Sequence, residues 1–288
     1  MPFNQQSNRA NPVIRFRSAN FFVAAILVLG VVGCDNEKFT PPPTEAEFSV
    51  GAFSVPYPSD VFITYAALNE AALVQAGAPG ASLTNTPIIP SAEDASDTGD
   101  VLIAQGFLDG FSVTMPMQLD FTHNLDPSTV VGGQTVRVFE ISISPPSATF
   151  AASGAPIAMP TSIIREFQAD SDYSVSMSKS VGYQIVVRPR IPWPASDNVS
   201  LGGQSRGILV AVTNGVRDFR GNPIIRSDQY DRMANQIDSD TGIESIDAFA
   251  NSVGAMVGSS LQLLAAQGMN PADIVVSNSF TCQSVNDV

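Results

Sequence analysis

The chain has 288 residues, of which 44% are hydrophobic and 14% charged, and it contains 17 Phe, 21 Gly and 21 Pro. This composition excludes a disordered chain and is typical of a β-rich core whose strands are separated by many turns. The net charge of −13 excludes nucleic acid as a partner, because binding to phosphates depends on Lys and Arg. One His and two Cys exclude the Cys/His zinc sites and leave a single candidate base for a nucleophile.

The first 34 residues have the pattern of a signal peptide that ends in a lipid-attachment site. Residues 1–20 are polar with three Arg and no acidic residue, and the apolar run 21–32, at about 12 residues, is too short to span a bilayer. Gly33-Cys34 follows and resembles the bacterial lipobox, in which a diacylated Cys becomes the new N-terminus. An ordinary secretory signal is the alternative. We predict a signal peptide over 1–33, a palmitate-carrying anchor on Cys34 and a Pro-rich tether over 34–47.

The anchor places the protein in the cell envelope, at the outer membrane or the cell surface. Asp35 resembles the inner-membrane retention signal of enteric bacteria, so the inner membrane is the alternative. Cleavage before Cys34 leaves 11 basic and 27 acidic residues, a net charge of −16. Such an acidic surface repels anionic lipid headgroups, so we expect the lipid on Cys34 to make the contact with the membrane.

Residues 48–105 are expected to form a loop-rich segment that packs along the rest of the chain. Four carboxylates within it could supply oxygens to Ca²⁺: Glu93, Asp94, Asp97 and Asp100. Their spacing is not that of an EF-hand loop, so a solvated acidic loop is favoured over a Ca²⁺ site. The same reasoning applies to a second group, Asp228, Asp231, Asp238 and Asp240. No other cofactor is expected.

Residues 106–288 are predicted to fold as a β-sandwich. Met117, Leu119 and Phe121 alternate with polar residues, which is the period of a half-buried strand. Further β-rich runs, separated by Gly, Pro and Asp, are 135–143, 162–167, 173–177, 183–187 and 207–213. Short strands at such spacing are typical of a sandwich of two sheets.

One amphipathic helix is predicted over 243–267, because its apolar residues recur every three or four positions. Thr241 and Glu244 have the spacing of a capping box, and Gly268 ends the helix. We expect the pair Gly254 and Gly258 to let this helix pack closely on a sheet. A last strand over 273–282 then completes the fold.

Four short motifs carry a resemblance to a known family. They are Pro56-Tyr57-Pro58-Ser59-Asp60, Asp109-Gly110-Phe111-Ser112, Leu125-Asp126-Pro127 followed by 135–140, and Ser279-Phe280-Thr281-Cys282-Gln283-Ser284. In this order they resemble the N-terminal domain of bacterial virulence-factor lipases, over about 48–284. The members are large lipid-anchored extracellular lipases or lysophospholipases. Cys282 departs from the family, which usually carries a second Thr at that position.

A second resemblance lies within the first. Strand 208–212 and the turn 214–223 look like the penultimate strand and turn of bacterial Ig-like domains. Gly215 and Gly221 are expected to supply positive φ in this turn, and Asp218 with Asn222 to bond their own backbone. The fold class that we predict is therefore mainly β, an Ig-like β-sandwich with a helical insertion before the last strand.

A lipase of the α/β-hydrolase type needs a Ser nucleophile between a strand and a helix, with Asp and then His later in the chain. The one formal match, Gly203-Gln204-Ser205-Arg206-Gly207, has a loop before Ser205 and a strand after it. The only His, His123, precedes Ser205, so no later base is available. We expect a turn Ser, a surface His and no catalytic residue in this chain.

The sequence therefore supports one function and two alternatives. The first hypothesis is a lipid-anchored, non-catalytic N-terminal module of an extracellular bacterial lipase or lysophospholipase. Its catalytic α/β-hydrolase domain would be absent from this chain, and we expect the DNA downstream of Val288 to encode it. The second is a stand-alone cell-envelope binding or adhesion lipoprotein with an Ig-like fold, and the third, an enzyme with its own site, is disfavoured by the missing base. Cys282, unpaired once Cys34 is acylated, is expected to be buried, the alternative being a Cys partner outside this chain.

Overall fold

The computed structural model describes residues 41–52, 54–62, 110–144, 158–178, 182–197 and 205–284. By its internal contacts the chain divides into two units, Met1–Pro42 and Pro43–Val288, and the fold described here belongs to the second. Within the described ranges, no helix is long and apolar enough to cross a membrane. The signal peptide, Cys34 and the acidic loop 93–100 lie outside these ranges.

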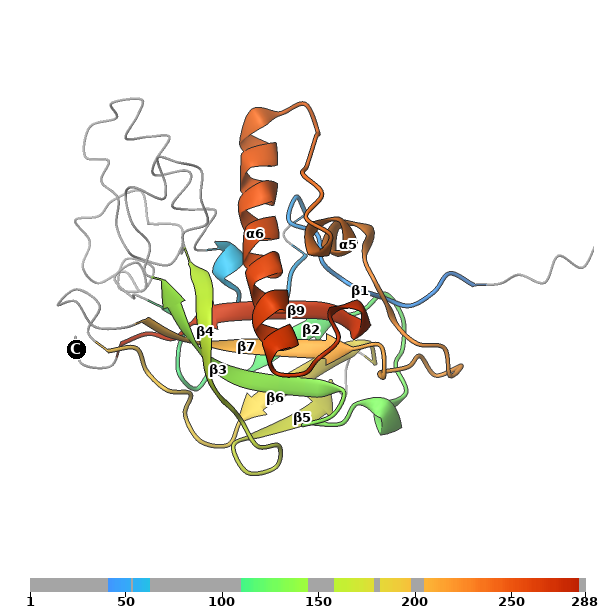
Figure 1. The fold of residues 1–288 in the computed structure, drawn as a ribbon. Coiled ribbons are helices and arrows are strands. Elements are labelled where there is room, and N and C mark those ends of the chain that lie inside the picture. Colours follow the sequence, from blue (N-terminus) through green and yellow to red (C-terminus); the bar gives the residue numbers. More distant parts are fainter. Residues whose placement is uncertain are drawn as a thin grey trace, which may run out of the picture. The chain divides into compact units, whose positions relative to one another are not determined.

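Two antiparallel sheets form the body of the fold (Figure 1). The four-stranded sheet has the order β4-β3-β7-β9, with β3 Val136–Ser144, β4 Met159–Glu166, β7 Ser205–Thr213 and β9 Ile274–Thr281. The three-stranded sheet has the order β2-β6-β5, with β2 Met117–Asp120, β5 Tyr173–Met177 and β6 Gln184–Pro189. The predicted mainly β class with a helix before the last strand is confirmed.

Shorter elements complete the topology. Strand β1, Glu45–Ala46, pairs in parallel with β8, Ile225–Arg226. The 3-10 helices are η1, Pro127–Thr129, and η3, Pro271–Asp273. Two α-helices lie wholly within the described ranges, α5, Asp228–Ala234, and α6, Glu244–Ala266.

The burial pattern follows from a helical layer that covers one sheet. Met117 and Leu119 of β2 are buried while Gln118 between them is exposed, as the period-2 pattern predicts for a strand with one solvated face. Strand β9 is instead buried at every position, because α6 packs on β4 and β9 (Figure 1). The four-stranded sheet thus lies between α6 and the second sheet.

The start of α6 differs from the predicted capping box. The helix begins at Glu244, and its N-cap residue, Ile243, makes no side-chain cap. Thr241 lies outside the helix because Gly242, at φ +77°, turns the chain between Thr241 and Ile243. The Asp247 carboxylate accepts hydrogen bonds from the Thr241 N–H at 2.8 Å and hydroxyl at 3.0 Å, so a residue from within the helix secures this end.

Helix α5 was not predicted, and it changes the role of the small residues on α6. A Cβ atom on Gly254 would lie 3.6 Å from Met233 Cγ, and one on Gly258 would lie 3.3 Å from Gln236 Nε2. Both neighbours belong to α5 or to the turn after it. The expectation that these glycines face a sheet is therefore wrong, and they allow α5 to approach α6.

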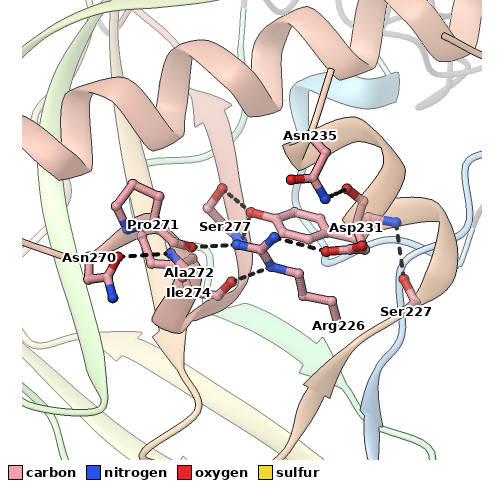
Figure 2. A network of polar contacts seen from close by, with 10 residues as sticks. Arg226, Ser227, Asp231, Asn235, Asn270, Pro271, Ala272, Ile274 and Ser277 are labelled. Carbon is pink, nitrogen blue, oxygen red and sulfur yellow. Dashed lines mark hydrogen bonds and ion pairs between the residues drawn. The ribbon is translucent and has the colours of Figure 1, made fainter. Parts of the chain in front are cut away.

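Arg226 holds the helical layer to the sheet (Figure 2). Its Nε donates to the Ile274 carbonyl at 2.8 Å, Nη2 donates to the Pro271 carbonyl, and Nη1 lies 3.0 Å from an Asp231 carboxylate oxygen. One guanidinium thus joins β8, α5 and the start of β9, and its five donors in a rigid fork suit this task.

The turn after β7 is only partly as predicted. Gly221 has φ +86°, but Gly215 does not have positive φ. A Cβ atom on Gly215 would lie 2.9 Å from the Thr135 side chain, so the absence of a side chain there serves packing. The Asp218 carboxylate accepts bonds from the Arg220 and Asn222 N–H groups, as expected for a side chain that bonds its own backbone.

Candidate functional site

Two of the sequence motifs meet at β9, which forms one edge of the four-stranded sheet. Asn278 Nδ2 donates to the Pro58 carbonyl at 2.7 Å. The Asp60 carboxylate accepts from the Thr281 N–H at 2.8 Å and from its hydroxyl at 3.1 Å. The motif 56–60 is therefore a segment that fastens the N-terminal part of the body to the last strand, across more than 200 residues of sequence.

A third motif adds to the same edge. Phe111 donates its N–H to the Thr281 carbonyl at 2.8 Å, and the Phe111 and Phe280 rings meet edge to face at 6.0 Å. A Cβ atom on Gly110 would lie 2.6 Å from the Cys282 carbonyl carbon, so this position has to be glycine. We call the assembly of 56–60, 110–112 and 278–284 the motif seam.

Asp60 and Cys282, two ionisable groups of the motif seam, are buried, and burial governs their pKa values. Burial raises the pKa of Asp60 to about 7, and the two hydrogen bonds from Thr281 oppose that rise. Burial also raises the pKa of the Cys282 thiol, and the nearby Asp60 and Glu140 carboxylates raise it further. The thiol stays protonated at neutral pH and is no nucleophile. The prediction that Cys282 is buried is confirmed.

A groove between α5 and α6 is a second candidate site. Its volume is about 1010 Å³, and its lining includes Met233, Phe249 and Gly254. The exposed side chains of Ile237 and Ile246 also line it. Apolar grooves with a few polar groups are the usual form of ligand sites. Sequence reasoning missed this groove because one of its two walls is the unpredicted helix α5.

The comparison with protein families identifies a match over most of the chain. Residues 51–288 match the family described as Bacterial virulence factor lipase N-terminal. The chain belongs to this family. No curated protein and no solved structure match it. The match includes all four motifs from which the resemblance was recognised, and three of them form the motif seam.

Ser205, the only formal candidate for a lipase nucleophile, does not lie on an elbow between a strand and a helix. It is the first residue of β7, pairs with Ile143 of β3 and is 3% exposed. The prediction that Ser205 lies in a turn is therefore wrong, because Ser205 belongs to strand β7. Its neighbour Arg206 forms an ion pair with the buried Glu140 at 2.7 Å, so the surroundings of Ser205 are those of a sheet interior.

His123 lies far from Ser205. It is exposed, as predicted, and its Nδ1 lies 3.0 Å from the Thr122 hydroxyl. The carbonyl of the adjacent Asn124 accepts the N–H of Phe219, in the turn beyond the opposite end of β7. Nine strand residues, about 26 Å, separate the two ends. The two side chains form no catalytic pair.

The acidic residues of the second predicted group are distributed around α5. Asp231 pairs with Arg226, and Asp228 opens the helix, where a carboxylate favours the helix dipole. In the ranges that the structure covers, no three His, Cys, Asp or Glu side chains gather as metal ligands would. The first group, Glu93, Asp94, Asp97 and Asp100, lies outside those ranges.

Proposed function

We propose that this chain is a lipid-anchored, non-catalytic N-terminal module of an extracellular bacterial lipase or lysophospholipase. The catalytic α/β-hydrolase domain is not among its residues. The family match over 51–288 is the observation that carries this proposal. The separation of Ser205 from His123 supports it, because a serine hydrolase needs its base within hydrogen-bond reach of the nucleophile.

The module holds a lipase at the envelope and does no chemistry itself. Its partners are the membrane, through the lipid on Cys34, and a hydrolase domain. The outer membrane or the cell surface is the location that we favour, and Asp35 keeps the inner membrane as the alternative. The motif seam supports this role, since its contacts fasten segments of the fold to one another.

The anchor is tested by replacing its cysteine. Cys34→Ser removes the acylated thiol, so we expect metabolic palmitate labelling to be lost and the protein to leave the membrane fraction. Cys282→Ala is the matched control, because it removes the other, buried cysteine and should leave labelling unchanged. Labelling that persists in Cys34→Ser contradicts the proposed anchor.

The groove between α5 and α6 favours a second function. A cavity of about 1010 Å³ whose lining mixes apolar with polar and charged residues has the size of a site for a small ligand. A stand-alone envelope binding or adhesion lipoprotein would use such a site without any hydrolase partner.

A further inference from the structure

The chain enters the sandwich at one end of its sheets. The Thr44 carbonyl accepts the Ile225 N–H at 3.0 Å, and the Glu45 carbonyl accepts the Thr122 N–H, also at 3.0 Å. Thr122 lies just after β2, and Ile225 opens β8. We call this the entry end. Strand β9 ends at Thr281, which pairs with Gly207 near the start of β7, at the other end of the sheets (Figure 1).

An exposed aromatic residue marks the entry end. The turn 217–222 lies there, since Asp126 donates its N–H to the Arg217 carbonyl at 2.9 Å. Phe219, at the tip of the turn, is 66% exposed, more than any other large hydrophobic side chain of the described residues. Tyr183, whose carbonyl accepts the Phe121 N–H, and Ile225 are exposed at the same end.

The turn is held rigid and presents only positive charge. The Asp218 carboxylate is buried and accepts from the Arg220 N–H at 2.9 Å, from the Asn222 N–H at 2.8 Å and from its Nδ2 at 3.1 Å. Arg217 and Arg220 are exposed on either side of Phe219. The Arg220 guanidinium lies 5.5 Å from the Phe219 ring centroid, and Arg217 Nη1 donates to the Gly221 carbonyl at 2.7 Å. An exposed ring with guanidinium groups close by suits the headgroup level of a bilayer, where rings embed and Arg binds phosphate.

The length of the tether favours contact between the entry end and the membrane. Ten residues join Cys34 to Thr44, and fully extended they reach about 35 Å. The sheets are about 26 Å long, so the far end could reach the bilayer only with the tether stretched along the whole body. The net negative charge of the chain opposes such a side-on approach to anionic lipid.

We infer that the anchored domain stands on its entry end, with Phe219 inserted at the headgroup level and Arg217 and Arg220 on lipid phosphates. The end of β9 then points away from the membrane. This inference rests on the proposed anchor at Cys34. It explains how an acidic protein contacts a lipid surface, because the contact is confined to one small basic and aromatic turn.

The test compares two probe positions in the anchored protein. Phe219→Cys and Ile191→Cys each replace an exposed large hydrophobic residue, at 66% and 47% exposure, and Ile191 follows the end of β6 that is far from the entry end. Each variant is labelled with an NBD fluorophore and reconstituted, lipidated, into phosphatidylethanolamine and phosphatidylglycerol vesicles that carry a nitroxide on the headgroup. Cys282 is buried and its pKa is raised, so we expect it not to react with the label. The parent protein without the added Cys, treated with the same reagent, checks this.

We expect the nitroxide to quench the emission from position 219 and to leave that from position 191 unchanged. Because both sites carry the same fluorophore, its own affinity for lipid cancels in the comparison. Equal quenching at both positions, quenching at 191 alone, or none at either overturns the orientation. Flotation of the vesicles separates the two proposals: protein that does not float contradicts the anchor, whereas floating protein without quenching at 219 contradicts only the orientation.

Discussion

The substitution Asp60→Asn should remove one specific pH dependence from the stability of the fold. The Asp60 carboxyl is buried, and its pKa rises from 3.8 to about 7. Between these values the unfolded chain has released the proton while the folded chain keeps it, so the free energy of unfolding falls as the pH rises. At about 1.4 kcal/mol per pH unit, the loss amounts to about 4 kcal/mol by neutral pH, and it is absent below pH 3.8.

Asparagine mimics the protonated carboxyl, since its Oδ1 can accept the Thr281 N–H and its Nδ2 can donate to the Thr281 hydroxyl. Urea unfolding of residues 35–288 at several pH values between 5 and 8 measures the difference between variant and wild type. We expect the free energy of unfolding of Asp60→Asn to rise relative to that of the wild type as the pH rises, and the difference to level off above pH 7. Asp170→Asn, at a side chain that is 90% exposed, is the control for loss of a carboxyl. If the difference in free energy of unfolding between Asp60→Asn and wild type stays constant with pH, the raised pKa of Asp60 is refuted.

Two further changes test the packing around β9. Gly110→Ala places a methyl group 2.6 Å from the Cys282 backbone and should lower the free energy of unfolding by about 2 kcal/mol or more. Gly51→Ala is the control, because its methyl group meets nothing within 4 Å and the stability should not change. Thermal unfolding measures both variants, and equal effects would contradict the close approach at Gly110. Tyr230→Phe removes a hydroxyl that lies 2.7 Å from the Ser277 hydroxyl and accepts the Ser277 backbone N–H at 2.9 Å. We expect the free energy of unfolding in urea to fall by about 1 to 3 kcal/mol. An unchanged urea midpoint would show that these hydrogen bonds are dispensable.

Local patterns predicted the strands well where one face of a strand is solvated. Met117 and Leu119 alternate with polar residues, and β2 lies where this pattern places it. Strand β5 has the predicted bounds, Tyr173–Met177. A period-2 pattern is visible in a sequence because it depends on neighbours within one strand.

The features that the sequence did not reveal depend on residues far apart in the chain. Helix α5 is short and opens with acidic residues, and its buried contacts come from Phe48 and Ser277, at opposite ends of the chain. The buried Asp60 accepts its hydrogen bonds from Thr281, which is 221 positions away. The groove, the motif seam and the raised pKa of Asp60 all follow from such distant contacts, so they require the structure.

The motif seam gives a physical reason for three of the four motifs. Asp60 holds the Thr281 backbone, Gly110 makes room for the backbone at Cys282, and Phe111 extends the hydrogen bonding beyond β9. Each residue type is required by a contact that another motif supplies. These contacts are structural, since each one fastens one segment of the fold to another.

The central claim is that this chain positions a lipase and has no nucleophile of its own. A fluorophosphonate probe tests it most directly, because the probe reacts with any activated Ser whatever the substrate. We expect folded residues 35–288 to remain unlabelled and to show no esterase activity on p-nitrophenyl esters or lysophospholipid, since Ser205 is buried in a strand and His123 lies at the opposite end of the sheets. Stoichiometric labelling that disappears, together with esterase activity, in Ser205→Ala would contradict the account.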